Sequence, residues 1–237
     1  MTNFNRKCKH CDEQIFKAPM TSNLLNRRQF IAGAALFLSD GTMALAQTSS
    51  AAAGDILAAK SPLGDIVVGR PEAPLTLVQY ASASCSYSAK FQREILPQLN
   101  KTYIEPGKLK LVFRELPQND RVTAVTLLAR CLPRERYFDA YNALFQSQDA
   151  WVSSQNPGPP ITRIVTGLGM SKETFEKCLA DRQKAAQLEA FRRKTVRDFG
   201  IEATPTFFLN GQKIFGRIDM ADLRSELFAA IDAALKQ

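Results

Sequence analysis

The stretch LTLVQYASASCSYS, residues 75–88, places a buried strand directly before the start of a helix. Its first six residues, Leu75 to Tyr80, include β-branched and aromatic side chains and predict a buried strand. From Tyr87 onward, apolar side chains recur every three to five residues, which predicts an amphipathic helix that ends at Pro106-Gly107. Cys85 therefore lies between a strand and the first turn of a helix.

The neighbouring segments extend this pattern in both directions. Upstream, the short apolar run 66–68 is followed by turn residues at 69–74, and downstream, residues 109–113 predict a second buried strand. A strand, a helix and a further strand form a crossover, which implies that the two strands are parallel.

The second half of the chain is mostly helical before it returns to strands. The segments with a helical pattern, interrupted by the Pro- and Gly-rich residues 153–160, are 121–132, 137–147, 161–168, 172–180 and 182–199. Residues 206–209 and 212–215 predict two strands joined by an Asn210-Gly211 hairpin turn. A last helix begins after Asp219, a suitable N-cap.

The order of elements predicts an α/β protein in which an all-helical domain interrupts a small mixed sheet. We divide the chain into an N-terminal extension and export signal, a linker, the first half of the sheet domain, the helical insertion and the second half of the sheet domain. These parts cover residues 1–46, 47–60, 61–118, 119–198 and 199–237.

The N-terminal segment has the pattern of a cleaved export signal. Arg27-Arg28 precede the apolar run 31–38, and Ala44-Leu45-Ala46 is a small-x-small cleavage site. The arginine pair resembles a twin-arginine signal. The apolar run is shorter than the roughly 20 residues that span a bilayer, so stable membrane insertion is not expected. The pattern predicts a periplasmic protein cleaved near Ala46.

Residues ahead of this signal receive little functional weight. Cys8 and Cys11 have the spacing of half a zinc site or of a redox pair, but a structural zinc site needs four ligands and no second pair lies nearby. Met20 is the alternative start of translation. We therefore expect no metal site. The net charge of +8 is spread along the chain rather than clustered, which argues against a nucleic-acid-binding protein.

Cys85 admits two interpretations from its position alone. The amide groups and the positive end of the dipole at a helix N-terminus stabilise a thiolate, which is the nucleophilic form of cysteine. The alternative is a small, buried, inert cysteine at the end of a strand.

Motifs along the whole chain favour the first interpretation, because together they resemble the DsbA-like family of thiol-disulfide oxidoreductases. They are Gly69-x-Pro71-x-Ala73-Pro74, residues 75–82, Cys85, Phe113-Arg114-Glu115-Leu116-Pro117, Cys178-Leu179-Ala180-Asp181 and residues 200–211, which contain Thr204-Pro205-Thr206. The resemblance covers about residues 62–235. It implies a thioredoxin fold with an inserted helical domain, and a cis Pro205 that faces Cys85. It also implies that Thr204 pairs with the substrate backbone.

Three departures from the family pattern concern the same site. The family commonly has Cys-Pro-x-Cys, whereas this chain places Ser88 where the second, resolving cysteine stands. Tyr87 replaces a histidine that is frequent in strongly oxidising members and cannot supply its positive charge. Gln79 occupies the position of a buried acid that serves the resolving cysteine, so the acid and the thiol are lost together.

The resemblance therefore implies a single-cysteine site. Cys85 is the expected nucleophile, and Ser88 is expected to donate a hydrogen bond to it. Tyr87, Thr204 and Pro205 are the expected substrate contacts. A mixed disulfide must then be resolved by an outside thiol such as glutathione, and no bound cofactor is expected.

Cys131 and Cys178 are the remaining cysteines after the export signal. The resemblance to DsbA-like proteins with a second disulfide favours a structural bridge between them, which suits an exported protein. Two buried thiols, or one that resolves Cys85, are the alternatives.

Three functions are compatible with this sequence. The first is a monothiol oxidoreductase that acts on cysteine-containing exported proteins and exchanges electrons with a membrane redox partner. The second is a binding protein that only captures clients through Cys85. The third is a glutathione-dependent transferase or isomerase, which the scarcity of glutathione outside the cytoplasm disfavours.

Overall fold

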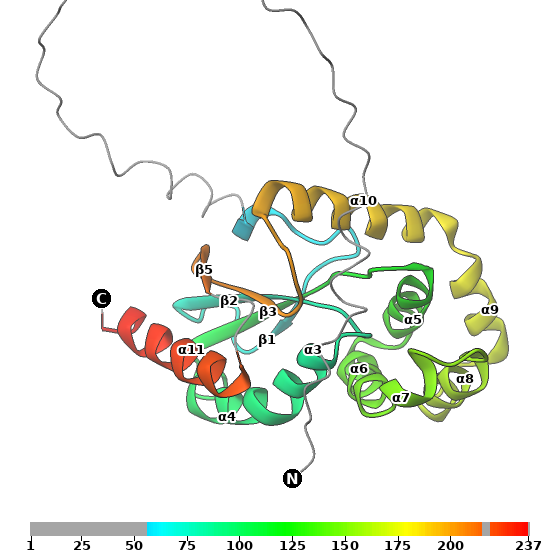
Figure 1. Cartoon of the computed structure of the whole chain (residues 1–237), viewed down its shortest axis with the longest axis horizontal. Helices are drawn as coiled ribbons and strands as arrows, with labels where there is room; N and C mark the ends of the chain where they lie inside the picture. The colour runs from blue at the N-terminus through cyan, green and yellow to red at the C-terminus, as the bar shows by residue number, and fades with distance from the viewer. Residues whose placement is uncertain (1–55, 215–218, 237) are drawn as a thin grey trace, which may run out of the picture.

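The computed structural model describes residues 56–214 and 219–236; the predicted export signal lies outside them. Figure 1 shows a central sheet with helices on both faces and a group of helices at one end. The elements are β1 (Ile66–Val68), β2 (Leu75–Ala81), α3 (Ser86–Lys90), η1 (Phe91–Ile95), α4 (Leu96–Leu99), η2 (Asn100–Ile104), β3 (Leu109–Glu115), α5 (Asp120–Cys131), η3 (Arg134–Arg136), α6 (Tyr137–Gln146), α7 (Gln148–Trp151), α8 (Gly158–Gly167), α9 (Lys172–Ala180), α10 (Arg182–Phe199), β4 (Thr206–Leu209), β5 (Gln212–Ile214) and α11 (Met220–Ala234).

The strands form one mixed sheet in the order β1-β3-β2-β4-β5. β2 and β3 are parallel, with Val78 opposite Val112, which confirms the predicted crossover. β4 runs antiparallel to β2, and the Asn210-Gly211 turn joins it to β5. Asn210 and Gly211 both have positive φ angles, as a tight hairpin turn requires. The central strand β2 ends at Ala81, four residues before Cys85.

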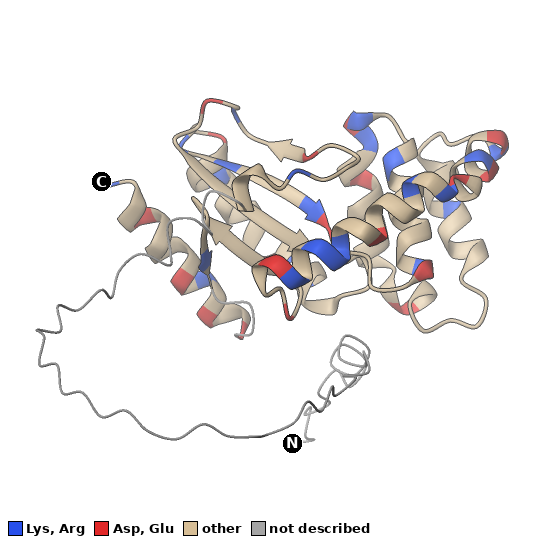
Figure 2. Cartoon of the chain, turned by 90° about the horizontal axis from the view of Figure 1, so that it is seen from above, with Lys and Arg blue, Asp and Glu red and all other residues tan. Residues whose placement is uncertain are grey.

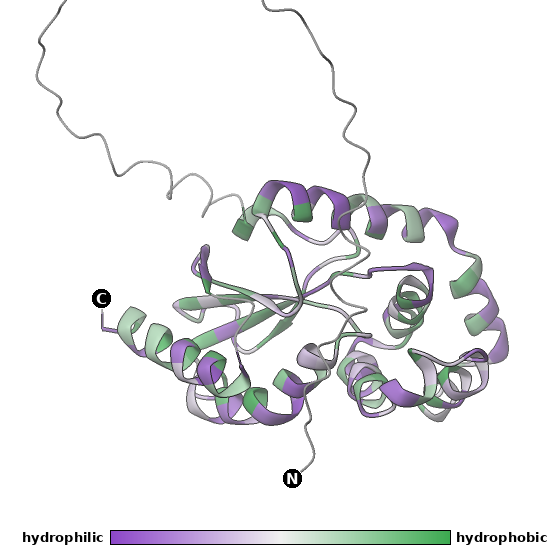
Figure 3. Ribbon diagram, viewed as in Figure 1, coloured by the Kyte–Doolittle hydropathy of each residue, from purple (hydrophilic) through white to green (hydrophobic). Residues whose placement is uncertain are grey.

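Side chains alternate between the two faces of the sheet, as the period of a β-strand dictates. Leu77 of β2 packs on one face with Phe91 and Leu227, so α11 and the helical stretch from α3 to η2 cover that face. Val78 packs on the other face with Phe191 of α10. Figure 3 shows hydrophilic stretches along α10 interrupted by hydrophobic residues, as expected for a helix that covers a sheet with one face.

The third cluster of buried side chains fills the helical insertion, α5 to α9, at the end of the sheet in Figure 1. Trp151, Tyr137 and Phe145 are buried there rather than exposed as a binding surface. The structure corrects one boundary: α8 begins at Gly158, not at Ile161. Pro159 and Pro160 lie in its first turn, where the missing N–H groups of proline cost no hydrogen bond.

The folded region also begins before the predicted end of the linker at residue 60. Ile56 is fully buried against the face that α10 covers. Its carbonyl accepts a 2.6 Å hydrogen bond from Arg114, whose guanidinium also pairs with Asp65 at 2.9 Å. Burial alone lowers the pKa of Arg114, but the hydrogen bond to Asp65 and the neighbouring groups outweigh it, and the pKa lies above its ordinary value. The apolar Ile56 is therefore part of the fold and not of a tether.

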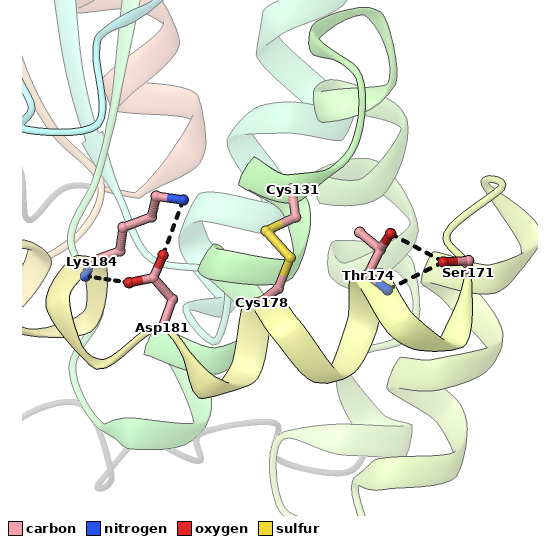
Figure 4. Close-up of a disulfide and its surroundings, with 6 residues drawn as sticks. All are labelled: Cys131, Ser171, Thr174, Cys178, Asp181 and Lys184. Carbon is pink, nitrogen blue, oxygen red and sulfur yellow. Dashed lines mark hydrogen bonds and ion pairs between the residues drawn. A yellow bond between two sulfur atoms is a disulfide. The ribbon is translucent and has the colours of Figure 1, made fainter.

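Cys131 at the end of α5 and Cys178 in α9 form a disulfide with a Cα–Cα distance of 6.4 Å (Figure 4). Capping side chains stabilise the starts of two helices in this region: Ser171 accepts from the amide of Thr174 at the start of α9, and Asp181 accepts from the amide of Lys184 at the start of α10. The bridge thus joins α5 to a helix that is itself well capped.

We expect removal of this bridge by Cys131→Ala and Cys178→Ala to lower the free energy of unfolding by about 2–4 kcal/mol, because a loop of this length restricts the unfolded chain. Thermal denaturation followed by circular dichroism should show a melting temperature lower by roughly 10 °C. The double variant and wild-type protein treated with a reductant should have the same melting temperature. This would show that the Cys131–Cys178 bridge accounts for the whole stabilising effect of disulfide bonding. An unchanged melting temperature in the double variant would contradict the prediction.

Candidate active site

Cys85 is the N-cap residue of α3, so it lies where the first backbone amides of a helix have no partners within the helix. The helical stretch continues through η1 and α4 to Ile104, which gives Cys85 the N-terminal position on a long helix. The side chain is only 2% exposed. The strand-to-helix position predicted from sequence is therefore present, but the sulfur is held inside the protein.

The loop before β4 reaches the sulfur of Cys85. The Thr204–Pro205 peptide bond is cis, as the family resemblance implied. Cys85 Sγ donates a hydrogen bond to the carbonyl oxygen of Thr204 at 2.9 Å. Residues 119 positions apart in the sequence are thus in direct contact, and the contact lies where the nucleophile and the substrate-binding residue were predicted to meet.

The turn that leads into Cys85 is held by its own residues and by the loop after β3. The amide of Cys85 donates to the carbonyl of Ser82 at 3.0 Å, and the hydroxyls of Ser82 and Ser84 share a 3.2 Å hydrogen bond. Ser84 Oγ also donates to Gln118 Oε1 at 3.4 Å. The small polar residues between strand and helix therefore fold the backbone back on itself rather than merely linking two elements.

A side chain from the helical insertion completes this turn. Gln148, the first residue of α7, donates from Nε2 to the carbonyl of Ala83 at 2.8 Å and to the carbonyl of Cys85 at 3.1 Å. Nothing in the sequence near Gln148 indicates this role, because the contact spans more than 60 residues. Only the packing of the insertion against the sheet domain shows it.

Ser88 lies one helical turn after Cys85 and is fully buried. The hydrogen bond that we expected from Ser88 to Cys85 is not formed: Ser88 Oγ has no hydrogen-bond partner within the described part of the chain. The thiol instead uses the Thr204 carbonyl, because the cis-proline loop presents an acceptor close to the sulfur. Ser88 thus stands at the position where a second cysteine was expected, but its hydroxyl makes no hydrogen bond to Cys85.

Gln79, the residue found where the family has an acid, alternates onto the same face of β2 as Leu75 and Leu77. It is fully buried, and neither its amide oxygen nor its amide nitrogen has a hydrogen-bond partner among the described residues. A neutral amide in this environment avoids the larger desolvation cost of a carboxylate.

Tyr87 is the exposed member of the site. Its side chain is 45% exposed, and Lys90 lies 5.6 Å from the centre of its ring. Because Tyr87 belongs to the first turn of α3, it is available to a molecule that approaches Cys85.

A family model described as "Thioredoxin" matches residues 61–232, most of the chain and both sides of the helical insertion. The chain belongs to the thioredoxin family. Its thioredoxin fold with a helical insertion is of the DsbA-like kind, which confirms both the family and the fold expected from the motifs.

Curated relatives and solved structures agree with this assignment. A Rickettsia prowazekii protein named as a protein-disulfide oxidoreductase is 29% identical over 148 residues, which are 62% of this chain and 54% of that protein. The crystal structure of Wolbachia pipientis α-DsbA1 superposes with a TM-score of 0.63 at 24% identity, covering 73% of this chain and 91% of that one. Bacillus subtilis BdbD also gives 0.63, at 23% identity, covering 73% and 94%.

This thioredoxin-family chain spans about half the length of the first curated relatives that it matches. The two superpositions below 25% identity show a shared fold.

Two opposing effects act on the thiol of this thioredoxin-family site. The amides of the first helical turn favour the thiolate. Burial favours the neutral thiol, and so does the hydrogen bond that the S–H group donates to Thr204, because a carbonyl oxygen accepts from a thiol but repels a thiolate. In this structure the Cys85 sulfur lies within hydrogen-bond distance of the Thr204 carbonyl oxygen.

A buried ion pair joins the end of β3 to the helical insertion. Glu115, at the end of β3, binds Arg130 of α5 through both carboxylate oxygens and accepts a 2.7 Å hydrogen bond from Tyr137. Burial lowers the pKa of Arg130, but Glu115 outweighs this effect and the pKa is raised above its ordinary value. Burial, and then the charge of Glu115, raise the pKa of Tyr137 well above its ordinary value. Arg130 and Tyr137 therefore stay charged and neutral, respectively.

The other expectations concern what the thioredoxin-family chain binds. The described residues contain no cluster of three His, Cys, Asp or Glu side chains suited to a metal ion. Figure 2 shows Lys and Arg interspersed with Asp and Glu, rather than gathered into a basic face for nucleic acid. Within residues 56–214 and 219–236, no helix has the length and hydrophobicity to cross a membrane.

Proposed function

We propose that the protein is a disulfide oxidoreductase of the DsbA type that acts on protein disulfides through the single nucleophile Cys85. The observation that carries this proposal is the contact between the Cys85 sulfur, at a helix N-terminus, and Thr204, the residue before the cis Pro205. A buried inert cysteine would not need two distant loops to converge on its sulfur. The relatives named as protein-disulfide oxidoreductases support the same chemistry.

The reaction proceeds by thiol-disulfide exchange. The Cys85 thiolate attacks one sulfur of a substrate disulfide and forms a mixed disulfide, and the other substrate sulfur leaves as a thiolate. An outside thiol then attacks Cys85 Sγ and releases the first substrate sulfur as a thiolate. A second outside thiol restores Cys85. The substrate disulfide is thus reduced to two thiols while two outside thiols become one disulfide.

Substrate binding activates the resting thiol in this scheme. An extended substrate segment pairs with the backbone of Thr204, so a substrate N–H takes the carbonyl that holds the Cys85 S–H group in the resting structure. The thiol then loses this acceptor, and the helix amides favour the thiolate. Tyr87 contacts the bound segment from its exposed position on α3.

We place this activity in the periplasm, on cysteine-containing exported proteins, with a membrane redox partner as the source or acceptor of electrons. The disulfide between Cys131 and Cys178 supports an oxidising compartment. The signal-like residues before Gln47 support export.

Export by the twin-arginine route predicts that Arg27→Lys combined with Arg28→Lys retains the precursor in the cytoplasm, whereas wild-type protein is cleaved after Ala46. Cell fractionation and N-terminal sequencing measure this. Arg6→Lys combined with Lys7→Arg is the control outside the signal. Normal export of the Arg27 and Arg28 variant would leave an ordinary secretory signal as the route.

A second candidate function, client capture without turnover, is favoured by Ser88, because a hydroxyl cannot resolve the mixed disulfide from within the site. Reduction of insulin, with and without glutathione, separates the two. Turnover that requires glutathione supports the oxidoreductase. Stable Cys85-dependent mixed disulfides, with no turnover under either condition, would replace it with capture.

A further inference from the structure

Gln148 links the helical insertion to the turn before Cys85, residues 82–85, through two side-chain hydrogen bonds. Both bonds come from its Nε2 atom, one to the carbonyl of Ala83 and one to the carbonyl of Cys85. Ala83 is fully buried, so its carbonyl cannot turn to water when this donor is removed. The Cys85 carbonyl also accepts from the amide of Ala89, the first hydrogen bond of the helix.

The short helix that carries Gln148 is itself fixed in place. Trp151, at the end of α7, is fully buried and donates from Nε1 to the carbonyl of Leu144 at 2.9 Å. Arg121 of α5 donates to the carbonyls of Trp151 and Val152. These bonds fix the C-terminal end of α7, so the Gln148 side chain at its N-terminal end meets the turn before Cys85 at a defined position.

We propose that Gln148 is a positioning residue that holds the Cys85 turn in its reactive geometry from the helical insertion. Its two N–H groups occupy carbonyl oxygens on both sides of Ser84, which fixes the direction of the Cys85 side chain relative to the helix amides and the Thr204 loop. They also place the positive end of an amide dipole beside a carbonyl that would otherwise repel a thiolate. This role rests on the proposed function, because positioning matters only for a cysteine that reacts.

Two substitutions separate positioning from simple structural support. Gln148→Leu keeps most of the volume and removes the donors, while Gln148→Glu keeps the size and shape but presents only acceptors to two carbonyl oxygens. We expect the chain with Cys8→Ser and Cys11→Ser as the common background, reacted with the small aromatic disulfide 5,5′-dithiobis(2-nitrobenzoate) at fixed neutral pH, to show a Cys85 rate about tenfold lower for Gln148→Leu. The rate for Gln148→Glu should be lower still.

The sign of this change is informative. Loss of a purely structural contact would loosen the turn and expose the sulfur, which is only 2% exposed, so the reagent would react faster. In insulin reduction, kcat should fall by a similar factor with KM unchanged, since Tyr87 and Thr204 remain in place. Gln146→Leu, on the exposed end of α6, is the matched control and should behave as wild type.

Faster or unchanged reaction of both Gln148 variants, or an equal effect of Gln146→Leu, would overturn the proposal. If Gln148→Leu fails to fold by circular dichroism, the isosteric Gln148→Glu still decides it. The reagent assay requires no protein substrate. Absence of insulin reduction by wild type would therefore remove the proposed function without touching this measurement, and unchanged reagent rates would remove only the role of Gln148.

Discussion

Replacing Cys85 with alanine should reduce catalysed insulin reduction to the rate of glutathione alone, a loss of at least about a thousandfold, as expected when a covalent nucleophile is removed. No neighbouring group can take over, because Ser88 carries a hydroxyl and Cys131 and Cys178 are bonded to each other in the insertion. The variant should remain folded, since alanine is small and apolar enough for the buried position. The measurement is the initial rate with saturating insulin and glutathione.

The control for this result removes the other cysteines instead. Cys131→Ala with Cys178→Ala lacks the bridge but keeps the site, so it should retain insulin reduction at a temperature where circular dichroism shows it folded. Loss of activity in that variant, together with full activity of Cys85→Ala, would show that Cys85 is not the nucleophile and would contradict the proposal.

The second large effect is a gain. Ser88→Cys should restore the dithiol site, because the new thiol lies one helical turn from Cys85 in a buried position already shaped for a small side chain. An adjacent thiol resolves the mixed disulfide from within the molecule, and effective molarities of roughly 10⁵ M or more for well-oriented groups make an outside thiol unnecessary for release of the substrate. Outside thiol is then consumed only to reduce the new internal disulfide before the next cycle. Under oxidising conditions, intact mass should show the loss of two hydrogen atoms beyond the two already lost in the Cys131–Cys178 bridge.

A matched variant tests whether position, rather than an added thiol, causes this gain. Ser86→Cys adds the same group at the exposed start of α3, directly beside Cys85, where a disulfide between neighbouring residues is strained. It should not form the internal disulfide. Adding Gln79→Glu to Ser88→Cys should speed resolution further by supplying a base. If Ser86→Cys and Ser88→Cys gave equal oxidation, the geometric argument for position 88 would fail.

The sequence predicted what depends on local pattern. Alternating and continuous apolar runs located β2, β3 and β4, and Asn210-Gly211 located the hairpin, because these signals are contained in a few adjacent residues. The family resemblance supplied the cis Pro205 and its place opposite Cys85. Residue types alone left Cys85 between a nucleophile and an inert core residue.

The remainder depends on contacts between distant segments. The buried Ile56 carbonyl is bound by Arg114, 58 residues away, so composition alone assigns it to a linker. Pro159 and Pro160 read locally as helix breakers, although the first turn of α8 accommodates them. The predicted hydrogen bond from Ser88 to Cys85 is wrong, and the Cys85 thiol bonds to the Thr204 carbonyl instead. Helical spacing indicates that residues 85 and 88 are neighbours, but it carries no information about the distance to a loop 119 residues away.

The disulfide of the insertion makes the protein a substrate of the kind of chemistry that it is proposed to perform. In the unfolded chain, Cys131 lies 47 positions from Cys178 and 46 positions (131 minus 85) from Cys85. Closure of the two loops differs by only about 0.02 kcal/mol, so chain statistics favour neither partner. The packing of α5 against α9, which brings the two sulfurs together in the folded structure, is therefore what distinguishes the correct pair. A mispaired molecule would lose its bridge and its nucleophile in a single event.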